Sequence, residues 1–208
     1  MAIAGGANAA LIAYWNFNEL SIATASAPGS GGVPTSINAS QGTGTLDLSS
    51  WGGTVDDFGG STINALNSDP AEESLSLVSN AGNGTYIQIS FSMTGFTSLD
   101  VTFATRGTST GFNTGQWSWS TDGSSFTDFG PNTATTSTSF ALAPTVSTSS
   151  LDEAATAYLR YTLNGASSTS GNNRIDNLQL NAIPEPGTLG VLMAAGAALA
   201  IRRRRRSE

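Results

Sequence analysis

The sequence predicts an all-β protein: a jelly-roll-like antiparallel β-sandwich followed by a short C-terminal transmembrane helix. Short segments of alternating apolar and polar residues recur along residues 10–182, with turn-forming residues between them. No amphipathic helix of useful length interrupts these segments. The chain then ends in an uncharged apolar run, residues 188–201, and five consecutive arginines.

Residues 10–182 are expected to form one sandwich domain of about nine or ten strands. The alternation is clearest in YIQISF at residues 86–91, which follows an Asn-Gly turn. Residues 21–45 are rich in Ser, Thr, Gly and Pro and are expected to form a long loop with one short strand at most. The other strands are expected at residues 11–17, 45–51, 61–66, 74–78, 99–105, 138–142, 157–163 and 174–180.

The strongest local signal is QWSWSTDGSSFTDF at residues 116–129. Asp122-Gly123 suits a two-residue hairpin turn, in which both central residues take a positive φ. In that register Trp119 lies opposite Phe126, with Trp117 on the same face.

Composition excludes several classes of function. The chain has 208 residues and no Cys, His or Lys, so disulfides, the usual zinc sites and histidine-based triads are excluded. Before Ile183, three arginines stand against thirteen acids, a net charge of −10. A domain so acidic repels nucleic acid backbones, and we expect no nucleic-acid partner.

The C-terminal segment combines three features in a fixed order. Pro184 and Pro186 restrict φ and keep the chain extended before a helix begins. The apolar run 188–201 then gives about 21 Å of helix at about 1.5 Å per residue, which is short for a membrane span. The arginines at its end are expected to stay on the cytoplasmic side of the inner membrane, with the rest of the chain exported.

Ile-Pro-Glu-Pro at residues 183–186, the apolar run and the arginine tail together resemble the PEP-CTERM sorting signal of Gram-negative bacteria, with Ile183 where Val is usual. The resemblance covers about the last 25 residues. It implies that an exosortase, a membrane transpeptidase, recognises the motif, removes the transient anchor and passes the protein to the cell surface or an exopolysaccharide matrix. The residues of this sorting signal are Pro184, Glu185, Pro186, Arg202, Arg203, Arg204, Arg205 and Arg206.

The domain boundaries follow from this division. Residues 1–9 end in Ala7-Asn8-Ala9, a small-x-small pattern typical of a signal peptidase site, although a basic region and an apolar core are missing. We therefore interpret residues 1–9 as the remnant of a signal peptide whose start lies upstream. Residues 10–182 form the sandwich, and residues 183–208 form the sorting signal.

Three further motifs resemble jelly-roll modules common in PEP-CTERM proteins and carbohydrate-binding sandwiches: YWNFNE at 14–19, WSWSTDGSSFTDF at 117–129 and RIDNLQL at 174–180. In such sandwiches an acid on the last strand and groups near the first strand share a structural Ca²⁺. The matching positions are Asp176 and Glu19. Oxygen ligands suit calcium, but no EF-hand spacing is present, so a domain without metal remains the alternative.

Four residues are candidates for ligand binding. Trp51 lies in a Gly-rich segment and is the tryptophan least committed to a strand, and Arg106 is a hydrogen-bond donor in the predicted loop 105–113. Trp117 and Trp119 could form an aromatic platform for a sugar ring. The alternative for this pair is the hydrophobic core.

These features predict a non-enzymatic exported protein with a structural or adhesive role and carbohydrate as its candidate ligand. The first alternative is a polysaccharide hydrolase, which would need two carboxylates across a cleft. The adjacent acids Asp56-Asp57, Glu72-Glu73 and Asp152-Glu153 fit solvated loops better. Gly107–Gly111 matches the G-x-S-x-G elbow by coincidence, because no His is available. Ice binding is a remote alternative, since the Thr-x-Thr at 43–45 does not recur at a fixed repeat.

Overall fold

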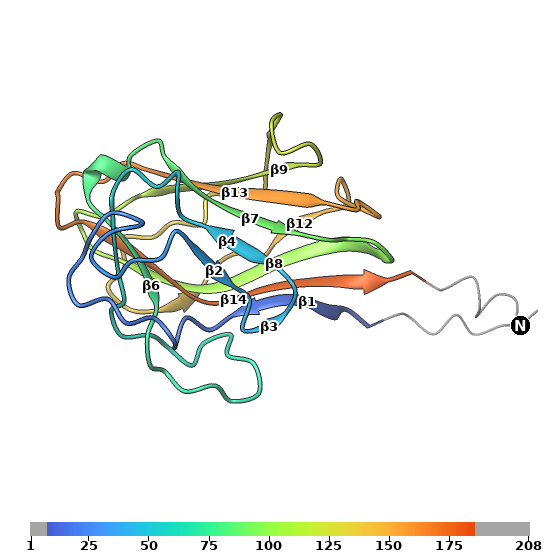
Figure 1. Ribbon diagram of the computed structural model, residues 1–208, viewed down its shortest axis with the longest axis horizontal. Helices are drawn as coiled ribbons and strands as arrows, with labels where there is room; N and C mark the ends of the chain where they lie inside the picture. Colours follow the sequence, from blue (N-terminus) through green and yellow to red (C-terminus); the bar gives the residue numbers. More distant parts are fainter. Residues whose placement is uncertain (1–7, 186–208) are drawn as a thin grey trace, which may run out of the picture.

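The computed structural model describes residues 8–185, which form two antiparallel sheets packed face to face (Figure 1). The eight-stranded sheet has the order β11-β8-β14-β1-β3, with β12 also on β8, β6 on β14 and β5 on β6. Its strands are β1 (Ala10–Trp15), β3 (Gln41–Gly42), β5 (Thr54–Asp56), β6 (Leu75–Val78), β8 (Phe96–Gly107), β11 (Ala141–Leu142), β12 (Val146–Thr148) and β14 (Asn172–Pro184).

The six-stranded sheet has the order β10-β9-β13-β7-β4-β2. Its strands are β2 (Ser36–Asn38), β4 (Thr45–Asp47), β7 (Tyr86–Phe91), β9 (Thr114–Ser120), β10 (Thr127–Phe129) and β13 (Ala157–Asn164). A single 3₁₀ turn, η1 (Asn80–Gly82), is the helical element of the described residues.

An aromatic cluster joins the two sheets at the centre of the core. Phe103 comes from β8 of the eight-stranded sheet, and Trp117 and Tyr161 come from β9 and β13 of the other sheet. Trp117 and Tyr161 stack with ring centroids 4.6 Å apart, and Phe103 meets each of them edge-on at 5.8 Å. All three are essentially inaccessible to solvent, so they contribute both buried apolar area and the preferred aromatic geometries.

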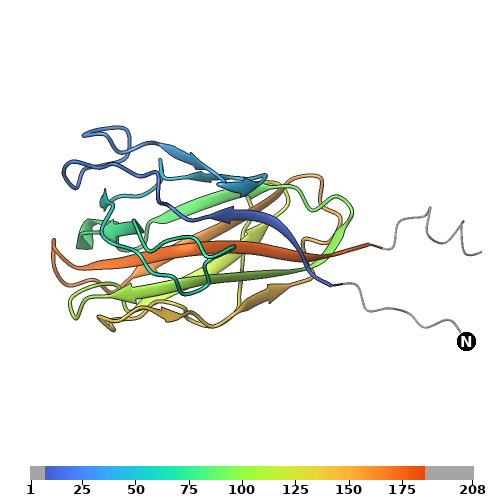
Figure 2. The same cartoon turned by 90° about the horizontal axis from the view of Figure 1, so that it is seen from below.

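The outer face of the eight-stranded sheet is covered by residues 57–73, the connection between β5 and β6. Seen from below in Figure 2, this connection crosses in front of β14. Asn177 fastens it from β14: its Nδ2 donates to the carbonyls of Ser61 at 2.7 Å and Ile63 at 3.0 Å, and its Oδ1 accepts the Tyr14 hydroxyl at 2.6 Å. We call these contacts the Asn177 latch.

A β-bulge makes the Asn177 latch possible. The register of β14 against β8 shifts between Asp176 and Gln179, and Asn177 has a φ of 50°. Asn tolerates this left-handed conformation better than most residues. The extra residue turns the Asn177 side chain outward and returns Leu178 and Leu180 to the core.

The structure confirms the all-β, antiparallel prediction and corrects several elements. β7 has the predicted bounds Tyr86–Phe91. Residues 61–66, predicted as a strand, instead form turns whose backbone bonds to side chains of the sheet beneath. The predicted strand at residues 45–51 is confined to β4, and that at 138–142 is confined to β11. Strands β2, β3, β5 and β12 were not individually predicted, because two or three residues are too few to show alternation.

The predicted hairpin exists, but its register was wrong. Thr127, not Phe126, lies opposite Trp119, so residues 121–126 form a longer loop. Gly123 has a positive φ of 71°, whereas Asp122 does not. The Asp122 carboxylate accepts the backbone N–H groups of Ser124 and Ser125, both at 2.8 Å. Such side-chain turns let Asp close a longer loop without the two-residue geometry.

The Asn177 latch predicts a specific loss of stability. Asn177→Ala removes three hydrogen bonds in a buried site and places Ala at a left-handed position, so the free energy of unfolding should fall by about 3 kcal/mol or more. The midpoint of urea unfolding measures this change. Asn181→Ala, on the same strand and with one 3.3 Å hydrogen bond to Gln179, is the control and should cost less than about 1 kcal/mol. Equal losses for the two variants would contradict the role given to the latch.

Candidate functional site

The outer face of the six-stranded sheet is polar and aromatic, and no connection comparable to residues 57–73 covers it in the described part of the chain. On β7, Tyr86, Gln88 and Ser90 are half-buried and alternate with buried Ile87, Ile89 and Phe91. β13 repeats the pattern, with Tyr158, Arg160 and Thr162 half-buried between buried neighbours. Because side chains alternate across a strand, the half-buried residues project from the sheet on the side away from the core.

Arg160 is held at the centre of this face. Its guanidinium carbon lies 3.6 Å from the ring centroid of Phe126 and 4.1 Å from that of Tyr86. Its Nε donates to Gln88 Oε1 at 2.9 Å. Aromatic rings on a guanidinium fix its plane, while its N–H groups point outward within that plane. The two amino groups of Arg160 are therefore left for water or a ligand.

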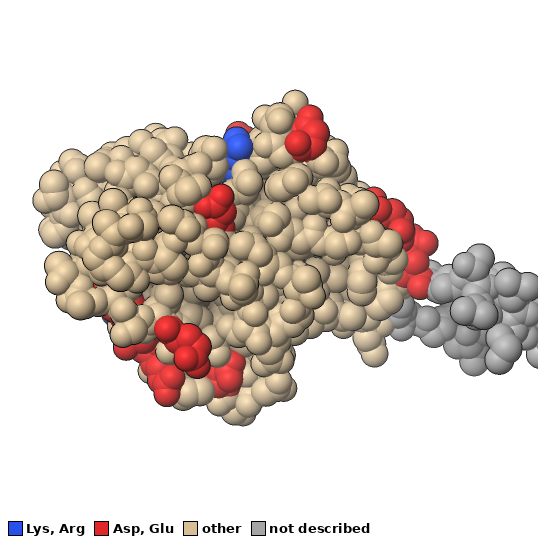
Figure 3. Space-filling view, in the orientation of Figure 1, with Lys and Arg blue, Asp and Glu red and all other residues tan. Residues whose placement is uncertain are grey.

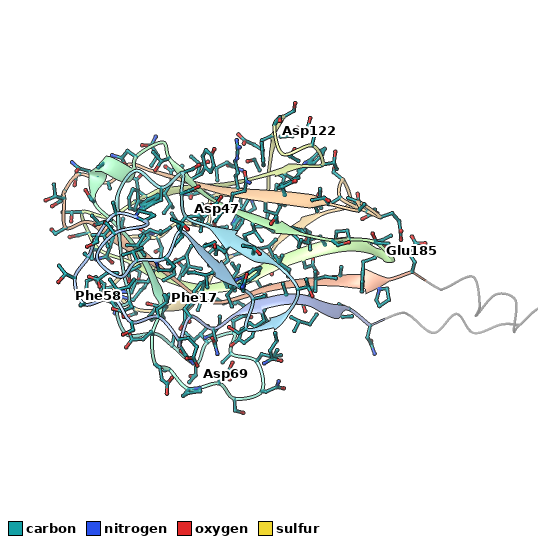
Figure 4. The ribbon with its side chains drawn as sticks, viewed as in Figure 1. Phe17, Asp47, Phe58, Asp69, Asp122 and Glu185 are labelled. Atoms are coloured by element: carbon teal, nitrogen blue, oxygen red, sulfur yellow. The ribbon has the colours of Figure 1, made fainter. Side chains whose placement is uncertain are left out.

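A row of polar residues crosses the sheet through Arg160. Asp47 opposes Gln88, and Gln88 opposes Arg160. Ser36 and Ser118 extend the row to either side, so it covers five strands and roughly 20 Å at the usual strand spacing. Figure 3 shows one basic patch above the acidic side chain that Figure 4 labels as Asp47, with further acidic groups at the margins of this view. We call this row, with Tyr86, Phe126 and Tyr158, the polar face.

A groove of about 530 Å³ lies at the β2 edge of the polar face. Ser36 and Asn38 of β2 line it, so the groove and the polar face are continuous. On its other side lies Phe17, which is buried and has a φ of 61°. Positive φ at a bulky residue is a strained conformation that often marks functional positions. The groove is lined by Asn16, Phe17, Glu19, Leu20, Pro34, Ser36, Ile37, Asn38, Ala39 and Ser40.

Two of the four predicted ligand-binding residues belong to the core instead. Trp51 is 4% exposed, its Nε1 donates to the carbonyl of Thr54 at 3.0 Å, and its ring meets Phe112 edge-on. Trp117 is fully buried in the aromatic cluster. Neither ring has a face open to a ligand, because an indole this large gains more free energy from burial than from exposure.

The other two predicted residues lie apart from the polar face. Trp119 is half-buried and packs against the core. Arg106 lies on β8 in the eight-stranded sheet, opposite Arg174. The four predicted residues therefore do not form one binding site.

The donors around Asp176 do not fit a calcium ion. Asp176 is 1% exposed, and its carboxylate accepts the backbone N–H groups of Ser61 at 2.6 Å and Asn177 at 2.9 Å. Glu19 is exposed and lines the groove instead. Calcium takes six to eight oxygen ligands, and residues 8–185 contain no group of three or more Asp or Glu side chains placed to hold a metal.

The sorting signal begins inside the sandwich. Ile183 and Pro184 end β14 and pair with Thr97 and Phe96 of β8. The backbone N–H of Glu185 donates to the carbonyl of Gly95 at 2.9 Å. Pro186, the predicted helix at residues 188–201 and the arginines Arg202–Arg206 lie outside the described residues.

Residues 182–206 match the model of the PEP-CTERM protein-sorting motif. The chain therefore carries this sorting motif, as the sequence predicted, and the motif implies export and a C-terminal membrane anchor before exosortase processing. Within residues 8–185, no helix is long and apolar enough to cross a membrane. A search of curated protein sequences finds no match.

Several solved structures resemble the chain at low identity. The CBM22-1 xylan-binding domain of Paenibacillus barcinonensis Xyn10C has a TM-score of 0.45 and 10% identity over 87% of this chain and 99% of its own. TmCBM61, solved with β-1,4-galactotriose, has a TM-score of 0.38 and 11% identity over 61% of this chain and 85% of its own. A cycloisomaltooligosaccharide glucanotransferase from Paenibacillus sp. has a TM-score of 0.38 and 9% identity, matching 62% of this chain and 16% of its own.

The residues of the polar face were missed by sequence reasoning. The signal was present in YIQISF and AYLRYTL, where the outward positions hold Tyr, Gln and Arg. Each segment alone indicates only a half-buried strand. Their meaning depends on β7 and β13 being neighbours, which brings Gln88 and Arg160 together.

Burial raises the pKa of the Asp176 carboxyl to about 7, and this predicts an unusual dependence of stability on pH. The folded pKa lies above the usual value of 3.8, so the folded state binds more protons than the unfolded state between about pH 4 and 7. The free energy of unfolding should therefore fall as pH rises through this window, by up to about 1.4 kcal/mol per unit. Urea unfolding at pH 5, 6, 7 and 8 measures the slope, and Asp176→Asn should remove it.

Asp122→Asn is the matched control for this slope. Hydrogen bonds from the backbone of Ser125 and Ser124 hold the pKa of the exposed Asp122 carboxyl well below its usual range. Its removal should lower stability by a constant amount above about pH 4, change the pH dependence of stability only below that pH, and leave the slope between pH 5 and 7 unaltered. A wild-type protein equally stable at pH 5 and 8 would contradict the assignment to Asp176.

Proposed function

We propose that the chain is a non-catalytic, jelly-roll-like sandwich that an exosortase system delivers from the inner membrane to the cell surface or an exopolysaccharide matrix, where its polar face binds carbohydrate. The polar face carries the ligand-binding part of this proposal. It combines the partly exposed rings of Tyr86, Tyr158 and Phe126 with hydrogen-bonding groups on one surface. Recognition of sugars needs both, because the hydroxyls take hydrogen bonds and the C–H faces of the rings pack on aromatic faces.

The shape of the surface favours an extended ligand. The row from Ser36 to Ser118 crosses five strands, and the groove at its β2 edge is an open depression. A small molecule is usually enclosed in a deep pocket. A polymer chain can instead follow an open surface and make a modest contact with each of several residues.

The absence of catalysis is part of the proposal, and the groove supports it. Hydrolysis of a glycosidic bond uses two carboxyl groups on opposite sides of the scissile bond. Among the residues that line the groove, Glu19 is the one acid. The polar face contributes Asp47, which is separated from Arg160 by Gln88 in the neighbouring strands.

Both termini of the described chain lie at one end of the sandwich, which suits a domain that is attached to the cell surface at that end. Ala10 pairs with Ala182, so both ends of the described chain leave the sandwich at one end (Figures 1 and 2). Figure 4 places Phe17, and with it the groove, toward the opposite part of the molecule from Glu185. A domain attached through its C-terminal side would direct the groove away from the point of attachment.

Variants of the polar face test the carbohydrate proposal. Affinity electrophoresis against a panel of soluble polysaccharides first identifies a retarding polymer. Tyr158→Ala and Gln88→Ala should each weaken its binding about tenfold, as expected for loss of one stacking or hydrogen-bonding contact in an interface. Leu142→Ala, at a 53% exposed apolar residue on β11, is the control and should bind as the wild type does. If no polysaccharide of the panel retards the wild-type protein, the carbohydrate proposal is wrong, and the protein would then have a structural role in the matrix alone.

A second experiment tests the sorting proposal. Glu185→Ala changes the sorting motif but keeps the backbone hydrogen bond to Gly95, so the fold should be retained. In a host with an active exosortase, the unprocessed chain should accumulate in the inner membrane, as detected by immunoblotting of membrane and surface fractions. Glu153→Ala is the control, because its carboxylate accepts the Gly95 N–H at the same end of the domain without belonging to the motif. Normal processing of Glu185→Ala would refute the role assigned to the motif.

A further inference from the structure

Two of the three arginines in the described residues stand side by side. Arg106 on β8 and Arg174 on β14 are directly opposed in the antiparallel pair. Like charges in this arrangement destabilise a sheet. Burial, followed by the charge of Arg106, lowers the pKa of the Arg174 guanidinium. Repulsion between the two guanidiniums is therefore one of the causes that lower the pKa of Arg174.

Three hydrogen-bond donors in this row lack partners. The Nε atoms of Arg106 and Arg174 are buried and unpaired, and so is the hydroxyl of Ser76. Ser76 lies opposite Arg174 on β6 and is fully buried. The three side chains therefore occupy adjacent strands in the order β6, β14, β8. An unpaired buried donor lowers the stability of the fold by about 1–3 kcal/mol. A ligand that accepts hydrogen bonds from these three donors would remove this penalty.

Aromatic rings hold the two guanidiniums from the sides. The guanidinium carbon of Arg174 lies 4.7 Å from the ring centroid of Phe58, and that of Arg106 lies 5.7 Å from that of Phe140. Arg174 also donates from Nη1 to the carbonyl of Gly59 at 3.0 Å. These contacts fix the planes of the guanidiniums, and a fixed fork of N–H groups matches an oxyanion that accepts two bonds at once.

Two acids limit the positive charge on one side of the row. Asp56 opposes Ser76 from β5, and the charges of Asp56 and Glu73 both act on Arg174. Burial raises the pKa of both carboxyls. Arg174 is thus partly compensated within the protein, and Arg106 is the better residue with which to test an external anion.

We infer that Arg106, Arg174 and Ser76 form a binding site for an oxyanion, a carboxylate or sulfate group of the kind that acidic polysaccharides carry. The site lies on the eight-stranded sheet, distinct from the polar face of the other sheet. It extends the proposed function to acidic glycans but does not depend on it. Figure 4 places Phe58, which flanks the site, at the end of the sandwich opposite Glu185.

Nuclear magnetic resonance of the arginine Nε–H groups tests the site directly. The full-length ¹⁵N-labelled chain in detergent is titrated with sodium glucuronate and, separately, with sodium sulfate. Sodium chloride at equal ionic strength and glucose serve as reference titrations. The Nε–H signals of Arg106 and Arg174 should shift and saturate. The Nε–H group of Arg160, which donates to Gln88 on the polar face, reports binding at that face separately.

Matched variants assign the effect. Arg106→Gln removes a charge and a donor and should weaken glucuronate binding about tenfold or more, whereas Glu153→Gln, which changes the charge by one unit beside Gly95 and outside both proposed sites, should leave it within about twofold. Should Arg106→Gln fold poorly, Arg106→Lys keeps the charge without the planar fork and should give an intermediate loss. The titration of the wild-type chain tests the site even if both variants fold poorly.

The outcomes separate the possible ligands and the two proposals. A response to glucuronate alone indicates uronic acids, a response to sulfate alone indicates sulfate esters, and a response to both indicates a general oxyanion site; each supports the inference. Equal shifts with chloride or glucose, or unchanged binding by Arg106→Gln, would overturn it. Tyr158→Ala should leave the response intact, so failure of the polar face and failure of this site can be told apart.

Discussion

The pairing of β14 with its neighbours is the constraint on which the rest of this structure depends. β14 lies between β8 and β1 and also binds β6, so it supplies backbone hydrogen bonds on both sides. Leu178 and Leu180 point into the core, while Asn177 turns outward at the bulge to fasten residues 57–73. Arg174 and the first residues of the sorting motif belong to the same strand. A disturbance of β14 would therefore reach the core, the covered outer face and the C-terminal segment together.

The two outer faces of the sandwich are used differently. The face of the eight-stranded sheet is largely covered by residues 57–73, whose backbone groups find partners in Tyr14, Asp176 and Asn177. The face of the six-stranded sheet stays open and is lined with hydroxyl, amide and aromatic side chains. Buried polar groups need partners, and the connection supplies them to Asp176 and Asn177 but not to Ser76 or to the Nε groups of Arg106 and Arg174. On the open sheet some of the polar groups pair with each other, as Arg160 does with Gln88.

The sorting motif and the fold overlap by a few residues. The motif begins at residue 182, within β14, and the backbone of Glu185 is still bonded to Gly95. The motif thus begins within the last strand of the domain, with no linker between them. Pro184, within the matched motif, is paired with Phe96 of β8.

The sequence by itself determined the strand character of the chain and the C-terminal motif, because alternation and the order of proline, apolar and arginine segments are local properties. It identified Tyr86–Phe91 in full. Only the tertiary structure decided that Trp51 and Trp117 are core residues, that the hairpin pairs Trp119 with Thr127, and that Arg106 meets Arg174. The physical reason is that burial, register and cross-strand neighbours depend on which distant strands pair, and no short segment contains that information.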